Sequence, residues 1–298
     1  MRYRIRHRSN YQYGQPVVTS FHRLHLIPRD DHGQRLCNHH LSIEGATGDC
    51  SEEQDLFGNR CGRLELLQPY QDLAITGWSE VAVERQLPQE SASTPWDRPP
   101  PIADPAVDDF RFDSLHVQCQ ADLAAYAAPS FIPGRPLVAA VADLTRRLQA
   151  DFTYDPQATD IATPLSTVLQ NRRGVCQDFA HLGLACLRCH GLAAAYVSGY
   201  LETQPPTGQP RLVGADASHA WIAVNDPAIG WFHADPTNGC LVGERHIVTA
   251  IGRDFADVSP ICGIVYGGGG AQQLTVAVDV VPESEWSSHP LTANWPMG

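Results

Sequence analysis

The first ninety residues alternate apolar and polar side chains over several short stretches. A period of two places successive side chains on opposite faces of a β-strand, and glycine, proline, aspartate and asparagine between such stretches favour turns. The alternating stretches lie at residues 2–7, 23–27, 41–44, 63–67 and 80–84. This pattern predicts an all-β N-terminal domain over residues 1–90.

The pattern changes at residues 91–111, which are rich in proline and show no regular spacing of apolar positions. Proline lacks a backbone N–H and fixes φ, so such a stretch suits neither a helix nor a central strand. We therefore expect a proline-rich linker at 91–111 and a second domain at 112–298.

Apolar residues at helical spacing predict helices over 115–128, 136–151 and 164–170 in this second domain. A fourth helix carries one apolar stripe at alternating steps of four and three residues: Val175, Phe179, Leu182, Cys186 and Cys189. Gly191 follows the stripe and is typical of the end of a helix.

Strand-like stretches follow this helix at residues 194–202, 218–225 and 230–235, with a last one at 274–281. The glycine run at 267–270 predicts a loop. Helices followed by a series of strands predict an α+β domain with an antiparallel sheet.

The 298-residue chain is 43% hydrophobic and has a formal net charge of −12, which is typical of a globular protein that repels nucleic acid and acidic membranes. No apolar run approaches the ~20 residues of a membrane span, and the first residues do not resemble a secretory signal. We expect a cytoplasmic protein with no nucleic-acid or membrane partner. Because the nine cysteines are an odd number, we expect no disulfide framework and mostly buried thiols.

Cys176 carries the clearest chemical signal, because it lies where a loop becomes the first turn of the fourth helix. The positive end of the helix dipole and the unpaired backbone N–H groups there favour the nucleophilic thiolate. A thiolate nucleophile also needs an imidazole that can protonate the leaving group.

His219 and Asp235 are the candidates for that imidazole and for the group that orients it. If residues 218–225 and 230–235 form a hairpin centred on residue 227, these two side chains lie directly opposite each other on one face. Taken singly, a cysteine, a histidine or an aspartate before proline is usually structural. Together the three residues specify a nucleophile, a base and an orienting carboxylate.

Several stretches also carry a family resemblance. They are RGVCQDFAHL at 173–182, YVSGY at 196–200, ASHAW at 217–221, GWFHADPTNG at 230–239, GRDFADVSP at 252–260 and DLFGN at 55–59. They resemble the bacterial transglutaminase-like family, whose members are often described as proposed cysteine proteases. The resemblance covers nearly the whole chain. It implies a papain-like, transglutaminase-like core preceded by a β domain, with Cys176, His219 and Asp235 as the catalytic triad.

Other contacts of the site remain open. The backbone N–H of Cys176 is the first candidate for a donor to an oxyanion, and Tyr154, Gln177 and Trp221 are candidates for a second donor or for substrate contacts. The family often has arginine before the YVSGY run, where this chain has Ala195. This departure leaves the substrate preference open.

These residues predict attack of the Cys176 thiolate on an amide or peptide carbonyl, giving a thioester that water or an amine resolves. We expect hydrolysis of a peptide or protein amide, as in a cysteine protease or amidase. An amine-accepting transglutaminase or acyltransferase is one alternative. A non-catalytic module that binds a peptide or protein on the same fold is another.

Two further patterns suggest cofactors but are set aside. The run Cys186-Leu-Arg-Cys189-His190 matches haem attachment, yet its cysteines belong to the apolar helical stripe. The spacings of another group match no usual zinc pattern: Cys37, His39, His40, Cys50 and Cys61. We therefore expect neither a cofactor nor a metal.

Overall fold

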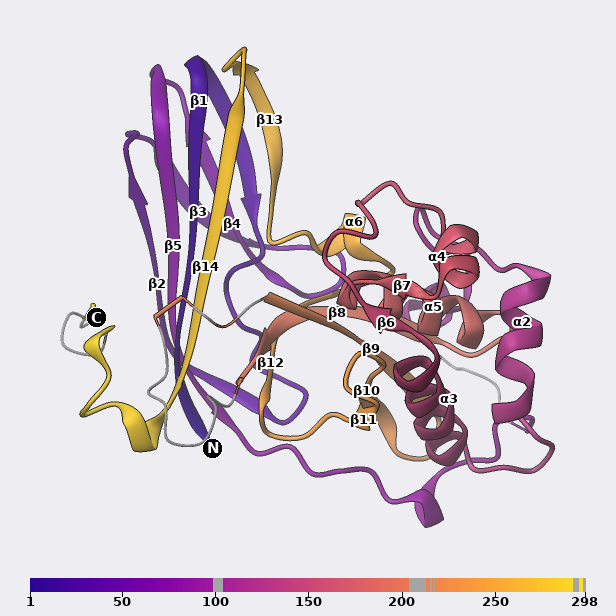
Figure 1. Cartoon of the computed structure of the whole chain (residues 1–298). Helices are drawn as coiled ribbons and strands as arrows, with labels where there is room; N and C mark the ends of the chain where they lie inside the picture. The colour runs from indigo at the N-terminus through magenta and orange to yellow at the C-terminus, as the bar shows by residue number, and fades with distance from the viewer. Residues whose placement is uncertain (99–103, 204–212, 215, 217, 292–294, 297–298) are drawn as a thin grey trace.

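The computed structural model describes residues 1–98, 104–203, 213–214, 216, 218–291 and 295–296. The tall sheet on the left of Figure 1 contains the N-terminal strands, and the helices gather around a second sheet on the right. The tall sheet has the order β2-β5-β1-β4-β3, with β1 (Arg2–Leu24), β2 (Gln34–Glu44), β3 (Asp49–Gln54), β4 (Arg60–Leu66) and β5 (Tyr70–Val83). The alternation at residues 2–7 reflects burial of one face of β1, where Tyr3, Ile5 and His7 are buried. The expected strand-rich N-terminal region is confirmed.

Two strands from the end of the chain complete this sheet. Both β13 (Ile261–Gly267) and β14 (Gln272–Pro282) pair antiparallel with β1. The sequence analysis had assigned them to the domain at 112–298, whereas the structure places them beside the N-terminal strands. They cover an edge of β1 whose N–H and C=O groups would otherwise lack partners. The division into domains stays a proposal, with residues 261–282 moved to the N-terminal sheet.

The second sheet is antiparallel and has the order β11-β10-β9-β8-β12. Its strands are β8 (Ala194–Leu201), β9 (Ser218–Asp226), β10 (Gly230–Asp235), β11 (Cys240–Leu241) and β12 (His246–Gly252). The expected α+β architecture with an antiparallel sheet is confirmed.

Four helices cover this sheet and bury one core with it. They are α2 (Ala121–Ala127), α3 (Leu137–Asp151), α4 (Leu165–Asn171) and α5 (Cys176–Arg188). Helix α5 is buried along almost its whole length after Gln177, which explains its continuous apolar stripe. No helix of the described residues is long and apolar enough to cross a bilayer.

Helix α2 begins at Ala121, six residues later than predicted from the apolar spacing. The residues before it are held by other contacts: the Asp254 carboxylate accepts the N–H of His116, and the Asp113 carboxylate accepts the N–H of Cys119. These side-chain acceptors compete with helical hydrogen bonds and keep this stretch out of the helix.

The remaining elements are short. They are η1 (Glu90–Ala92), α1 (Pro105–Asp108), η2 (Asp109–Arg111), η3 (Ala128–Ser130), β6 (Thr153–Tyr154), β7 (Arg173–Gly174), α6 (Phe255–Val258) and η4 (Glu283–Glu285). The proposed linker runs through η1, α1 and η2, and its residues 99–103 lie outside the described part. The Asp226 carboxylate accepts hydrogen bonds from Ser93 and Thr94 and so fixes the start of the linker to the second sheet.

The two sheets meet through an apolar cluster. Tyr3, Ile5 and Val81 of the tall sheet are buried together with Tyr200 of β8 and Ile247 of β12. Beside this contact, Gly199 of β8 lies so close to its neighbours that an added Cβ would be 2.6 Å from the Trp221 ring and 2.1 Å from the Ile247 carbonyl oxygen. Glycine is therefore required here by the close approach of β12 and Trp221.

Candidate active site

Cys176 is the first residue of α5, as the sequence predicted. The Asp178 carboxylate accepts the backbone N–H of Val175 at 2.8 Å and the hydroxyl of Thr159 at 2.6 Å. The contact of the Asp178 side chain with the Val175 N–H is one half of a capping box. It fixes the turn that presents Cys176. A Cβ at Gly174 would be 2.6 Å from the same carboxylate, so the residue before Val175 has to be small.

The hairpin of β9 and β10 has a slightly different register from the predicted one. Its pairs include Asp226 with Gly230 and Ile222 with Ala234, so the turn centres on residue 228 and not on 227. Continuing this register sets Asp235 opposite Trp221 and diagonal to His219. Because side chains alternate between the two faces with a period of two, a register shift of two residues leaves each side chain on the same face. His219 and Asp235 therefore still share one face.

His219 and Asp235 are in direct contact despite this shift. His219 Nε2 donates to Asp235 Oδ2 at 2.8 Å, and the His219 side chain is 10% exposed while that of Asp235 is fully buried. The same carboxylate oxygen accepts from Asn238 Nδ2 at 2.6 Å and from His246 Nε2 at 3.0 Å. The other carboxylate oxygen accepts the N–H groups of Thr237 and Asn238. Asp235 is thus saturated with donors.

These contacts determine the charges. Burial alone would raise the pKa of Asp235, but hydrogen bonds from His219 and His246 hold it well below its usual range. Burial opposes a charge on His219, yet hydrogen bonds with Asp235 and Cys176 raise its pKa to about 10. Burial lowers the pKa of His246. Of the two imidazoles on one carboxylate, His219 therefore carries the charge.

The proximity of His219 and Cys176 joins the two halves of the candidate site, because the Cys176 side chain lies close enough to the imidazole to add to its raised pKa, after the effect of Asp235. Cys176 is half-buried. The structure therefore brings together the three residues that the sequence singled out.

The other candidates lie at different places. Strand β6 sets Tyr154 beside Gly174 of β7, and the Tyr154 side chain is 54% exposed. Its pKa is raised mainly by partial burial and in addition by the nearby Cys176 thiol. Gln177 faces another side, where it lines a hollow of about 190 Å³ with His116 and Asp178. Ala195 is fully buried in β8.

Trp221 is fully buried, and its indole N–H donates to His233 Nδ1 at 3.0 Å. Its ring lies 5.9 Å from that of His219 and 5.2 Å from that of His246. An N–H that already has a buried acceptor is not free for an oxyanion, so Trp221 supports the imidazoles from behind.

Sequence reasoning missed His246, Asn238 and Asp178. His246 begins β12, and no spacing in the sequence connects it with β10. Asn238 lies within the stretch GWFHADPTNG and Asp178 within RGVCQDFAHL, so the stretches that suggested the family held a signal for both.

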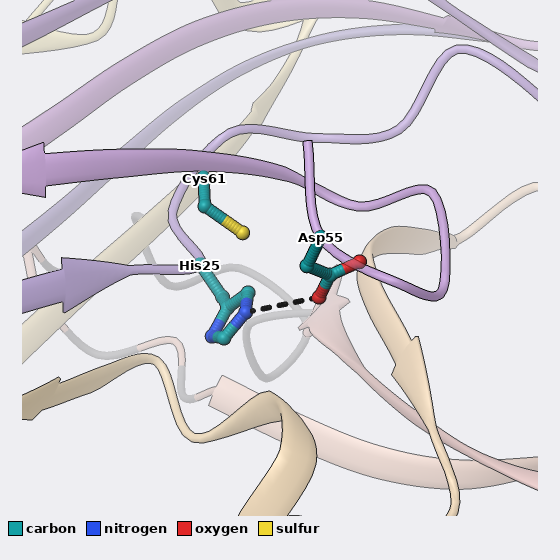
Figure 2. Close-up of side chains that lie close together, drawn as sticks. All are labelled: His25, Asp55 and Cys61. Atoms are coloured by element: carbon teal, nitrogen blue, oxygen red, sulfur yellow. Dashed lines mark ion pairs between the residues drawn. The ribbon is translucent and has the colours of Figure 1, made fainter. Parts of the chain in front are cut away.

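Among the residues that the structure describes, two groups of side chains have the donor atoms for a metal ion. The first is His219, Asp235 and His246, whose nitrogens are already hydrogen-bonded to the carboxylate. The second lies away from Cys176 and consists of His25, Asp55 and Cys61, shown in Figure 2.

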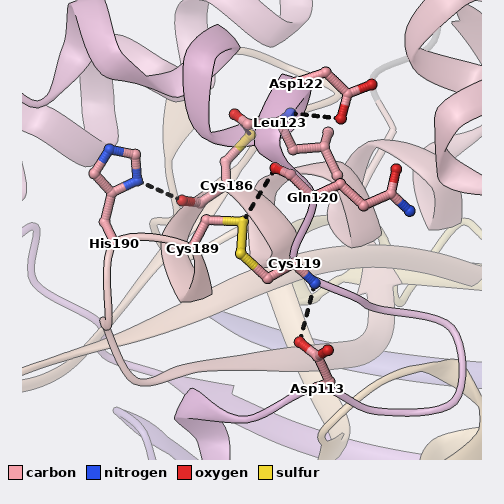
Figure 3. The surroundings of a disulfide bond; sticks show 8 residues. All are labelled: Asp113, Cys119, Gln120, Asp122, Leu123, Cys186, Cys189 and His190. Carbon is pink, nitrogen blue, oxygen red and sulfur yellow. Dashed lines mark hydrogen bonds between the residues drawn. A yellow bond between two sulfur atoms is a disulfide. The ribbon is translucent and has the colours of Figure 1, made fainter.

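The cysteines differ from expectation. Figure 3 shows a disulfide between Cys119, before α2, and Cys189, at the end of α5. Of the free thiols only Cys61 and Cys186 are buried, whereas Cys37, Cys50, Cys240 and Cys262 are exposed. The expectation of mostly buried thiols was wrong, because most of these cysteines lie on solvent-facing strand positions. The disulfide also involves Cys189 of the haem-like motif.

Comparison with known proteins agrees with this fold. Residues 3–82 match the bacterial transglutaminase-like N-terminal region, and residues 130–236 match the transglutaminase-like superfamily. An uncharacterized protein of Mycobacterium tuberculosis is 43% identical over 291 residues, which cover 94% of this chain and 93% of the relative. The chain therefore belongs to the transglutaminase-like superfamily, in the bacterial group that carries this N-terminal region.

Two further proteins are similar to parts or to all of the chain. A protein-glutamine gamma-glutamyltransferase of Pseudomonas aeruginosa is 32% identical over 103 residues, 33% of this chain and 15% of that protein. A crystal structure described as a proposed cysteine protease from Cytophaga hutchinsonii has a TM-score of 0.76 and 21% identity, with 94% of this chain and 90% of that chain covered. The latter shows the shared fold.

Proposed function

We propose that the chain is a thiol-dependent acyl-transfer enzyme with Cys176 as nucleophile, His219 as acid and base, and Asp235 as the orienting carboxylate. The observation that carries the proposal is that one imidazole contacts both the thiol of Cys176 and the buried carboxylate of Asp235. Nucleophile, base and orienting group in this chain of contacts are the general signature of an activated nucleophile.

The contacts suggest a sequence of steps. His219 Nε2 is held by Asp235, which leaves Nδ1 to hold the proton that the Cys176 thiol gives up. This transfer produces the charged imidazole that the raised pKa of His219 favours. The thiolate attacks the carbonyl carbon of an amide, and the C–N bond breaks as His219 returns the proton to the leaving nitrogen. The thioester that remains is cleaved by water or by an amine, again with His219 as the base.

The oxyanion needs donors near Cys176. Its own backbone N–H lies in the first turn of α5, where it has no helical acceptor. Tyr154 is the better second candidate, because it is exposed and close to Cys176. Gln177 faces the hollow on the other side, so we place it in a supporting position.

We propose hydrolysis of a peptide or protein amide as the main outcome, in a protein that works in the cytoplasm. The amine-accepting alternative is favoured by one observation, the partial similarity to a protein named as a protein-glutamine gamma-glutamyltransferase. The two outcomes use the same thioester and differ in the group that resolves it.

A single experiment separates these functions. The wild-type chain and a Cys176→Ala variant are incubated with glutamine-containing peptides, with and without a primary amine, and the products are weighed by mass spectrometry. Hydrolysis gives cleaved or deamidated peptides, and transfer gives amine adducts. We expect products from the wild type and none from Cys176→Ala.

A Cys50→Ser variant is the matched control, because it removes an exposed thiol of strand β3 in the tall sheet and should behave as the wild type. Equal product from wild type and Cys176→Ala would contradict the proposal. No product from either protein, with the peptide retained on the chain, would favour the binding module.

A further inference from the structure

The stretch DLFGN at residues 55–59 has no role in the proposed reaction, yet it holds a carboxylate in a fixed position. The N–H groups of Phe57 and Asn59 donate to Asp55 Oδ1 at 2.9 and 2.8 Å. The side-chain amide of Asn59 donates to Asp55 Oδ2 at 2.8 Å. These bonds fix the second carboxylate oxygen, which faces His25 (Figure 2).

His25 presents an unpaired nitrogen to this carboxylate. Its side chain is 1% exposed, and its Nδ1 lies 2.9 Å from the carbonyl oxygen of Ser259. A carbonyl only accepts, so Nδ1 carries the proton and Nε2 of the neutral ring has a lone pair. That buried Nε2 has no hydrogen-bond partner and lies 3.5 Å from Asp55 Oδ2, which is longer than an ordinary hydrogen bond.

Cys61 completes the group from strand β4. It is fully buried, and its sulfur, the His25 imidazole nitrogen and an Asp55 carboxylate oxygen all lie within 4.8 Å of one another. Three donor atoms that converge at this spacing around an unpaired lone pair leave room for one cation between them.

We propose that His25, Asp55 and Cys61 form a binding site for Zn²⁺. Nitrogen, oxygen and sulfur donors together suit this metal and not the hard cations Mg²⁺ and Ca²⁺. A neutral imidazole, a carboxylate and a thiolate balance the two charges of the ion, which suits a buried position.

The surrounding contacts are those of a metal site. The carbonyl of Ser259 fixes the tautomer of His25, and the amide of Asn59 fixes Asp55. Asn59 also bonds both the N–H and the carbonyl of Ile251 in β12, each at 2.8 Å. The ion therefore strengthens the junction between the tall sheet and the second sheet.

One side of the site is open to a cavity of about 620 Å³, which His25 and Asp55 line together with Arg29, Phe57, Trp231 and Arg253. Three protein ligands beside a cavity leave the fourth position of the zinc ion to water or to a small donor group.

A proton is the competing occupant of this place. The choice between proton and metal is open to measurement with the full-length chain.

The test uses the full-length chain after removal of metal by a chelator, titrated with Zn²⁺ alone and, in parallel, with Co²⁺ alone. We expect one equivalent of Zn²⁺ to bind and raise the melting temperature, and Co²⁺ to give thiolate charge-transfer absorption in the near ultraviolet. Cys61→Ser should abolish that absorption. It should also weaken Zn²⁺ binding by more than the roughly 10–100-fold that loss of an outer partner causes.

His246→Gln and Cys176→Ala are the matched controls and should keep both signals. His246→Gln alters the other group of side chains with donor atoms for a metal, and Cys176→Ala removes a half-buried thiol outside both groups. If Cys61→Ser fails to fold by circular dichroism, Cys61→Ala replaces it. The proposal is overturned if the wild type shows no thiolate band, if a Cys61 variant keeps it, or if Cys176→Ala loses it. This test does not depend on catalysis by Cys176.

Discussion

At the scale of single residues, Asp235 is the residue that determines proton transfer in the proposed mechanism. It accepts from His219, His246 and Asn238 through one oxygen, and it keeps His219 in the tautomer that faces Cys176. Asp235→Asn would offer an N–H where two imidazoles now donate. We expect kcat to fall by on the order of 10³–10⁴-fold, the size seen when an orienting aspartate is lost, with the fold retained by circular dichroism. Activity within a few-fold of wild type would contradict the role of Asp235.

The charge on His219 predicts an unusual pH dependence. Because the pKa of His219 is raised to about 10, the imidazolium that we propose as the acid for the leaving group persists far above the ordinary pKa of 6.5. The profile of kcat/KM should therefore show no basic limb until about pH 10. The same shift contributes stability that is complete below pH 6.5 and is lost as the pH rises through about 10. A basic limb of kcat/KM near pH 6.5 in the wild type would refute this assignment.

Single residues also show what sequence could predict. The proximity of Cys176, His219 and Asp235 could be predicted because a helix start and a hairpin are local patterns, and a register error of two residues left the face of each side chain unchanged. His246 and the group of His25, Asp55 and Cys61 were not found. Their contacts depend on how distant strands pack, and the interval from 25 to 55 to 61 follows no known ligand spacing.

At the scale of elements, α5 has to present Cys176 from a fixed first turn. The carboxylate of Asp178 holds Val175 and Thr159 at that turn, and burial raises its pKa. Asp178→Ala removes an acceptor that satisfies an N-terminal N–H, at a cost of about 0.5–2 kcal/mol in the free energy of unfolding.

We expect Asp178→Ala to lower kcat more than it changes KM, since the nucleophile is displaced while the cleft remains. Urea unfolding and steady-state kinetics measure the two effects. Asp178→Asn keeps an acceptor for Val175 and should recover most of the activity. Unchanged kcat in Asp178→Ala would show that the first turn of α5 is fixed by other contacts.

Element boundaries were predictable where burial follows period or spacing, as for α3, α5 and β10. Helix α2 was predicted too long, because the acceptors that hold residues 115–120 come from Asp113 and Asp254. Strand β13 was not predicted, since it is largely exposed and lacks the alternation of a half-buried strand.

At the scale of the whole molecule, two kinds of contact join segments that are far apart in the sequence. Strands β13 and β14 return to β1, and a disulfide joins Cys119 to Cys189 across 70 residues of sequence. Neither pairing has a local signal, so the sequence predicts neither the return of the C-terminal strands to β1 nor the bond between Cys119 and Cys189.

The disulfide predicts a stability difference. Cys119→Ser should lower the free energy of unfolding by about 2–4 kcal/mol, because the cross-link restricts the unfolded chain. Urea unfolding without reductant measures this loss, and Cys262→Ser, which removes an exposed free thiol, is the control. Equal stability of all three proteins would show that the bond does not form. That result would agree with the proposed cytoplasmic location, where thiols stay reduced.

The central claim is that His219 activates Cys176, and the rate of alkylation at each cysteine tests it most directly. The wild type and a His219→Ala variant are treated with iodoacetamide at neutral pH, and each labelled cysteine is quantified by peptide mass spectrometry. We predict that Cys176, although half-buried, reacts faster than the exposed Cys37, Cys50, Cys240 and Cys262, and that His219→Ala removes this advantage. A rate at Cys176 no higher than at those thiols, and unchanged in His219→Ala, would contradict the account.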